Sequence, residues 1–76
     1  MRADSDQGRE WMRLFGEAVR RRRADLALSQ AALAQAAGVS LPYISQVEHG
    51  TRNISLVNIR AFAEALECSP AVFFED

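Results

Sequence analysis

The chain has 76 residues, a length that supports one domain with a single small core. Hydrophobic residues make up 49% of the sequence, beside only two prolines and four glycines, which excludes a disordered or low-complexity chain. The formal net charge is −1, which by itself argues against a nucleic-acid partner, although the distribution of the charges carries more information.

Cysteine content and hydropathy predict a cytoplasmic protein. Cys68 is the single cysteine, so no internal disulfide can form, and a small buried or half-buried side chain is its expected role. The sequence shows neither a signal peptide nor an apolar run of membrane-spanning length, which argues against export and membrane insertion.

The first predicted element is an amphipathic helix from about Gly8 to Ala24. Residues 1–7 are polar, and we expect them to fray. Along the helix, apolar residues recur at spacings of three and four, which predicts one stripe that packs against the second and fourth helices. The stripe consists of Trp11, Leu14, Phe15, Ala18 and Val19.

Charged residues are distributed unevenly along the chain. Residues 20–23 are all arginine, with Arg13 before them and Arg52 well after them, which predicts a basic pole. A solvated helix face is the alternative interpretation for Arg21 and Arg22. The C-terminal end is acidic and predicts an opposite pole, formed by Glu64, Glu67, Glu75 and Asp76.

The next stretch, residues 29–50, reads SQAALAQAAGVSLPYISQVEHG and predicts two short helices joined by a sharp turn. Ser29 and Ser40 are suitable N-caps, and Gly38 supplies the positive φ that a chain commonly needs on leaving a helix. Each helix carries apolar residues at helical spacing, so both stripes share one core. The inward positions are Leu33, Ala34, Ala37, Val39, Ile44 and Val47, and the outward positions are Pro42, Ser45, Gln46 and His49.

Two further helices complete the predicted fold. Ser55 is a suitable cap for a fourth helix that extends to about Glu67. Its apolar stripe consists of Leu56, Ile59, Phe62, Ala63 and Leu66. Pro70 suits the first turn of a short fifth helix that carries Val72, Phe73 and Phe74. No strand is predicted, so the expected class is all-α with five helices.

The paired helices resemble the helix-turn-helix of the phage-repressor (lambda-repressor-like) DNA-binding domains. The resemblance rests on Leu28-Ser29-Gln30, on Gly38 and on the small or apolar inward residues, and it extends from about Phe15 to Phe74. The segments EHGTRNISLVNI and ALECSPAVFFE resemble the controller proteins of restriction-modification systems. The resemblance implies a compact single domain over residues 1–76, with the motif at about 29–49.

The same resemblance implies which residues meet DNA. The expected partner is a double-stranded operator with two half-sites, bound by a homodimer whose third helix enters the major groove. Gln46 suits an adenine edge, whereas Leu41 and Pro42 offer only apolar contact, for instance to thymine methyl groups. The expected base contacts are Leu41, Pro42, Ser45, Gln46 and Arg52. The expected contacts to the DNA backbone are Ser29, Gln30, Ser40, Tyr43, His49, Thr51 and Asn53.

Two structural roles also follow from the resemblance and the spacing. Glu48 is expected to form a partly buried ion pair with Arg23, as the matching residues do in repressors of this type. Phe73 and Phe74 are adjacent and point roughly 100° apart on a helix, so one of them is expected to face a second subunit. The expected dimer interface consists of Ile59, Phe62, Val72, Phe73 and Phe74.

Catalysis and metal binding are not predicted. His49 has no second histidine, cysteine or carboxylate at a metal-ligand spacing, and no phosphate-binding glycine loop is present. The sequence thus favours a transcriptional regulator without a cofactor or small-molecule ligand. The alternative is a protein-interaction module, either an antitoxin or an adaptor. An additional tail would favour that alternative, and the sequence ends at Asp76, just after the fifth predicted helix, which favours a stand-alone regulator.

Overall fold

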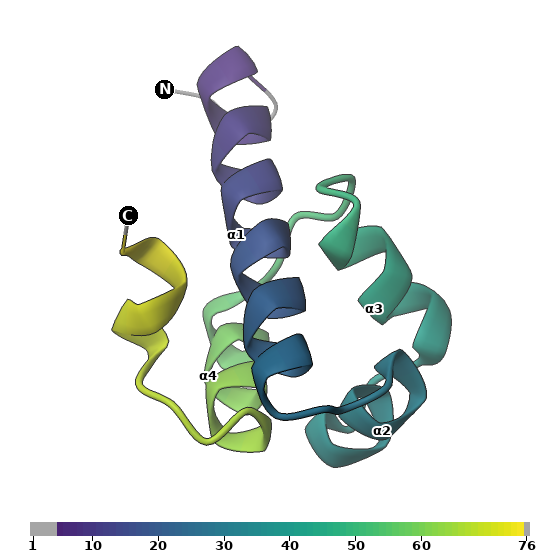
Figure 1. Cartoon of the computed structure of the whole chain (residues 1–76). Helices are drawn as coiled ribbons and strands as arrows, with labels where there is room; N and C mark the ends of the chain where they lie inside the picture. Colours follow the sequence, from purple (N-terminus) through teal and green to yellow (C-terminus); the bar gives the residue numbers. More distant parts are fainter. Residues whose placement is uncertain (1–4, 76) are drawn as a thin grey trace.

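The computed structural model describes residues 5–75, which form four α-helices and a final 3-10 helix around one core (Figure 1). No strand occurs in these residues, so the predicted all-α class is confirmed. In chain order the elements are α1 (Asp6–Asp25), α2 (Gln30–Ala37), α3 (Leu41–Glu48), α4 (Leu56–Ala65) and η1 (Pro70–Phe74).

A serine caps the start of each α-helix. The Oγ atoms of Ser29, Ser40 and Ser55 accept backbone N–H groups at 3.0, 3.2 and 3.2 Å, which confirms the predicted caps. Ser5 does the same for α1, with a distance of 3.1 Å to the amide nitrogen of Gly8. This cap starts α1 at Asp6, two residues before the predicted start at about Gly8, and residues 1–4 lie outside the described part of the chain.

The predicted short fifth helix is present as a 3-10 helix. It has five residues, begins with Pro70 and ends where Glu75 adopts an extended conformation. The amide of Val72 donates to the carbonyl oxygen of Ser69 at 3.0 Å, a bond that closes a tight turn. A five-residue segment can form few hydrogen bonds between residues four apart. Bonds between residues three apart pair more of its backbone groups, which favours the 3-10 helix.

The core takes buried side chains from every element. They are Phe15, Ala18 and Val19 of α1, Leu33 and Ala34 of α2, Ile44 and Val47 of α3, Phe62 and Ala63 of α4, then Leu66 and Phe73. The sequence predicts α2 and α4 as the neighbours of α1. The structure corrects this in part, because α1 packs chiefly against α3 and η1, while α2 packs against α3 and α4. The Phe15 ring of α1 still lies 6.2 Å from the Phe62 ring of α4.

Two glycines allow α1 to approach the end of α3. A Cβ atom on Gly16 would lie 2.2 Å from the carbonyl oxygen of Val47, so a larger residue would force the two helices apart. Gly50 has a φ of +74°, and a Cβ atom there would lie 2.8 Å from the Cα atom of Arg13. The C-terminal end of α3 is therefore held against α1. The side of α3 that faces away from α1 stays exposed to solvent.

The predicted apolar stripe of α1 is only partly buried. Trp11 and Leu14 remain 52% and 41% exposed, so the prediction that they belong to the core is wrong. Their side chains lie near η1, which is too short to cover them.

Candidate nucleic-acid interface

The turn between α2 and α3 depends on Gly38. Its φ of +74° lies in the left-handed region, as the sequence predicts. No atom lies within 4 Å of the position that a Cβ atom would take. Glycine is therefore favoured here because of the positive φ and not because of a close contact. The amide of Val39 then donates to the carbonyl oxygen of Ala34 at 3.0 Å, which closes the turn. Figure 1 shows α2 and α3 together on one side of the molecule, away from η1.

Helix α3 buries one side and exposes the other. Ile44 and Val47 are fully buried, as predicted. Most of the residues expected to contact bases lie outside the core, with Leu41, Pro42, Gln46 and Arg52 exposed and Ser45 half-buried. The helix thus exposes its first turn and the side of Gln46 to solvent.

Three of the expected DNA-contacting residues form one cluster, which we call the reading cluster: Tyr43, Gln46 and Arg52. Arg52 Nη1 donates to Oε1 of Gln46 at 3.3 Å, and its guanidinium carbon lies 5.0 Å from the centre of the Tyr43 ring. The hydroxyl oxygen of Tyr43 accepts a hydrogen bond from Nδ2 of Asn58 at 3.0 Å. Sequence patterns alone do not predict that these residues touch, because Arg52 lies in the turn after α3.

The segment after α3 is held by bonds back to that helix. Nδ1 of His49 lies 2.7 Å from the carbonyl oxygen of Ser45, so this nitrogen is the donor. Thr51 Oγ1 donates to the carbonyl oxygen of Gln46 at 3.1 Å. Phosphate oxygens only accept, and a neutral His49 ring then has an acceptor left at Nε2. These bonds hold His49 and Thr51 against the end of α3, and their contact with the DNA backbone stays a prediction.

The remaining expected backbone contacts keep donors available. The hydroxyls of Ser29 and Ser40 accept the capping N–H groups, which leaves their own protons for a phosphate. Gln30 is half-buried and donates one amide hydrogen to Oε1 of Glu48 at 3.0 Å, which leaves a second hydrogen. Asn53 is exposed in the turn before α4.

Behind α3, Arg23 and Glu48 form the expected ion pair. Arg23 Nε and Nη2 donate to the two carboxylate oxygens at 2.7 and 3.0 Å, and Nη1 donates to the carbonyl oxygen of Leu28 at 2.9 Å. Burial acts to raise the pKa of Glu48, but the bonds from Arg23 and Gln30 outweigh it, so the pKa lies below the usual glutamate value. The pair joins α1 to the end of α3.

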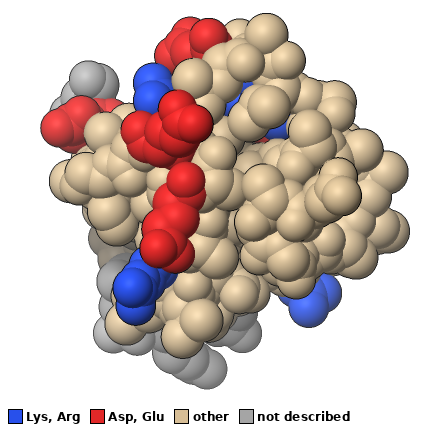
Figure 2. Space-filling view, turned by 90° about the horizontal axis from the view of Figure 1, so that it is seen from below, with Lys and Arg blue, Asp and Glu red and all other residues tan. Residues whose placement is uncertain are grey.

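The predicted basic pole is only partly correct. Arg22 donates from Nε to the carbonyl oxygen of Leu66 at 2.9 Å and from Nη2 to that of Glu67 at 3.1 Å, so it binds the end of α4. Arg23 is bonded to Glu48, so two of the four consecutive arginines stabilise the fold. Figure 2 shows a stripe of acidic side chains across one face of the molecule. Asp76, a member of the predicted acidic pole, lies outside the described residues.

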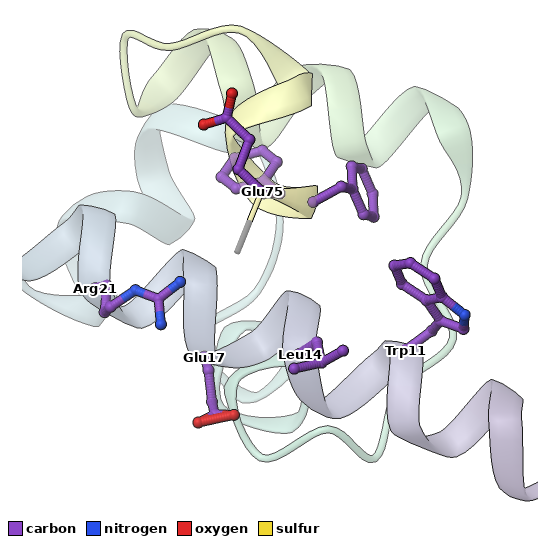
Figure 3. Close-up of a pocket in the computed structure, with 7 residues that line it drawn as sticks. Trp11, Leu14, Glu17, Arg21 and Glu75 are labelled. Atoms are coloured by element: carbon purple, nitrogen blue, oxygen red, sulfur yellow. The ribbon is translucent and has the colours of Figure 1, made fainter.

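A small pocket lies between α1 and η1 (Figure 3). Its volume is about 140 Å³, and its lining combines the exposed apolar residues Trp11, Leu14 and Phe74 with charged residues. The Trp11 and Phe74 rings lie 6.2 Å apart. Figure 3 shows Leu14, Glu17 and Arg21 following one another along α1, with Glu75 across the pocket.

The predicted dimer interface needs correction at two positions. Phe62 and Phe73 are 0% and 2% exposed, so they belong to the core of one chain and offer no surface to another. Phe74 is 48% exposed, so the structure does place one of the two adjacent phenylalanines outside the core. Val72 is exposed and Ile59 is half-buried.

Metal-binding clusters and membrane-spanning helices are both absent from the part of the chain that the structure describes. Within residues 5–75, no group of three or more His, Cys, Asp or Glu side chains could hold a metal ion. None of the helices in this range is long and apolar enough to span a membrane.

Known proteins resemble this chain in sequence and in structure. Residues 19–73 match the model of the helix-turn-helix family. The control protein C.BamHI of Bacillus amyloliquefaciens is 43% identical over 58 residues, which cover 75% of this chain and 72% of that protein. Repressor protein C2 of Salmonella phage P22 is 44% identical over 57 residues, which cover 75% of this chain and 26% of the repressor.

A solved structure extends the similarity to nearly the whole of another chain. The restriction-modification controller protein C.AhdI from Aeromonas hydrophila matches with a TM-score of 0.81 and 41% identity, over 83% of this chain and 96% of that chain. Other relatives are longer, and this chain spans between 26% and 43% of the length of three of them.

Proposed function

The chain belongs to the helix-turn-helix family of DNA-binding transcriptional regulators, and on this premise we propose that it binds a two-half-site operator as a homodimer. The observation that carries the proposal is the outer side of α3. There Gln46 of α3 is exposed and in contact with the exposed Arg52 of the following turn, while the other side of α3 is buried in the core. Membership of this family also confirms the predicted class of transcriptional regulator.

The proposed docking places α3 in the major groove. Side chains near its N-terminal end then reach base edges, while hydroxyl and amide donors meet the phosphates on either side. Leu41 and Pro42 supply apolar contact, and the reading cluster supplies hydrogen bonds. Ser29 and Ser40 supply donors at the starts of α2 and α3, where helix N-termini also favour phosphate.

The proposed dimer uses the surface where α1 meets η1. Phe74, Val72, Trp11 and Leu14 are large apolar side chains that one chain leaves exposed. A second copy would remove this apolar area from water, and a two-fold interface would set the spacing of the two α3 helices. Half-sites read by such dimers lie about 34 Å apart, or a multiple of that distance.

We further propose that the protein is a restriction-modification controller that acts in the cytoplasm without a cofactor. The support is its similarity to C.AhdI over 96% of that chain and to C.BamHI over 72% of that protein. An adjacent restriction endonuclease gene and methyltransferase gene would agree with this role. Neighbouring genes of another kind would contradict the controller role, while the chain would still be a transcriptional regulator.

Selection from a pool of random double-stranded DNA tests operator binding. The expected result is enrichment of one two-half-site sequence, with a Kd at least about a thousandfold below that for unselected DNA. Sedimentation at high micromolar concentration should show a dimer. A protein that enriches no sequence would contradict the proposal and favour the alternative of a protein-interaction module.

A further inference from the structure

The contacts within the reading cluster determine which hydrogen-bonding groups it offers to a base. Arg52 Nη1 lies 3.3 Å from Oε1 of Gln46, and the Arg52 guanidinium lies over the Tyr43 ring at 5.0 Å from its centre. Both contacts involve the same guanidinium, so Arg52 connects the Tyr43 ring to the Gln46 amide. The three side chains therefore form one connected group.

Tyr43 gives Arg52 a fixed platform. Its hydroxyl is bonded to Asn58 Nδ2 at 3.0 Å, and its ring meets the buried Phe62 ring edge-on, with 6.3 Å between centroids. A ring held at both ends cannot turn away, and a cation above its face gains from the ring quadrupole. Arg52 is thus positioned by the core through Tyr43.

The contact with Arg52 determines which end of the Gln46 amide faces it. A guanidinium contains only donors, so the amide atom beside it is the oxygen and not the nitrogen. The Gln46 amide nitrogen then keeps two N–H groups for a partner, and Arg52 keeps its remaining N–H groups. Apart from one lone pair on the shared oxygen, the reading cluster presents hydrogen-bond donors.

We propose that Arg52, seated on Tyr43, is a positioning residue that holds Gln46 as a donor, so that the reading cluster selects guanine in the major groove. This inference deepens the proposed operator binding and rests on it. Guanine presents two acceptors, N7 and O6, whereas adenine presents the acceptor N7 beside an N6 donor. A cluster of donors satisfies both guanine atoms but sets a donor against the adenine amino group.

The proposal reverses the preference of a free glutamine. A glutamine that turns freely pairs with adenine, because its oxygen accepts from N6 while its nitrogen donates to N7. Arg52 engages one lone pair of that oxygen and places its own N–H donors beside it, so we expect it to change the base that Gln46 favours. Removal of Arg52 should consequently alter which base is read, and not only how tightly DNA is held.

Selection from random DNA by four proteins tests this inference: wild type, Gln46→Ala, Arg52→Ala and Tyr43→Leu. The position of interest is the base pair whose preference Gln46→Ala abolishes. At that position the wild type should prefer guanine to adenine by about fivefold or more in Kd. Arg52→Ala should bind more weakly and prefer adenine, and Tyr43→Leu should shift in the same direction.

The matched control is Arg60→Ala, which also removes an exposed arginine but lies on α4, where it faces Glu64 at 3.9 Å. This variant should keep the guanine preference of the wild type. Circular dichroism should show that all variants retain their helices, and only folded variants are compared.

The outcomes separate this inference from the function on which it rests. A wild type that enriches a sequence supports operator binding in every case. If that wild type prefers adenine at the Gln46 position, or if Arg52→Ala keeps the guanine preference, the positioning role is overturned while operator binding stands. A Gln46→Ala protein with an unchanged profile would also overturn it.

Discussion

Truncation of Glu48 to alanine should destabilise the domain by about 3 kcal/mol. Glu48 is 5% exposed and accepts hydrogen bonds from Arg23 and Gln30. Without the carboxylate, Arg23 keeps a single bond to the Leu28 carbonyl oxygen and a charge with little access to water. Loss of one partner of a buried ion pair costs about 3–5 kcal/mol. Because the Arg23 side chain is still 18% exposed, we expect the lower end of that range.

Thermal and urea denaturation measure this loss. For a domain of this size, a change of 1 kcal/mol moves Tm by about 4–8 °C, so Glu48→Ala should melt at least about 12 °C lower. The control is Glu64→Ala, because Arg60 and Glu64 are 3.9 Å apart and their side chains are 79% and 69% exposed. An exposed pair contributes about 0–1 kcal/mol. A Glu48→Ala protein that melts together with Glu64→Ala would refute the argument.

The same ion pair predicts a pH dependence. The pKa of Glu48 is lower in the folded chain than in the unfolded chain, where it has its usual value. The carboxylate therefore contributes its full stability above the usual glutamate pKa, and this contribution is lost as the pH falls through the lower, folded pKa. The difference in unfolding free energy between wild type and Glu48→Ala should shrink on acidification. A constant difference would contradict the assigned role.

Three further predictions concern packing, assembly and base reading. Gly16→Ala should lower stability by about 1–3 kcal/mol in urea denaturation, because the added Cβ meets the Val47 carbonyl oxygen at 2.2 Å; an unchanged midpoint would show that α1 and α3 separate freely. Phe74→Ser should sediment as a monomer while its helical circular dichroism persists, and a persistent dimer would place the interface elsewhere. Gln46→Ala should lose about 1–3 kcal/mol on the selected operator and little on random DNA, whereas the control Gln35→Ala, at an exposed position of α2, should change neither. An equal loss on both DNAs would contradict α3 as the reading helix.

Local signals in the sequence predicted the parts of the fold that depend on neighbouring residues. The serines before α2, α3 and α4 cap their helices through bonds that span three residues, so sequence spacing is sufficient to find them. Gly38 adopts the expected left-handed conformation for the same reason. The positions of Gln46 and Arg52 outside the core followed from helical spacing and family resemblance.

Features that depend on packing between distant segments were missed. Gly16 looks like an ordinary position of α1, and only the approach of the Val47 carbonyl shows why a larger residue is excluded. Trp11 fits the apolar stripe of its helix but lies beyond the reach of the short η1, so it stays exposed. Phe62 fits an interface pattern equally well, yet it fills the centre of the core. Periodicity identifies the apolar side of a helix, but it does not identify the segment that packs against that side.

Some arginines hold the fold together while Arg52 stays exposed, and this division is consistent with the proposed operator binding by a chain of net charge −1. Arg22 and Arg23 bind the ends of α4 and α3, and Arg13 pairs with acidic neighbours on α1. Arg52, by contrast, lies against the reading cluster at the end of α3. Non-specific affinity grows with the number of cations that meet phosphates, whereas discrimination grows with well-placed donors at base edges. If the proposed reading cluster meets base edges, it adds discrimination that the net charge of −1 does not limit.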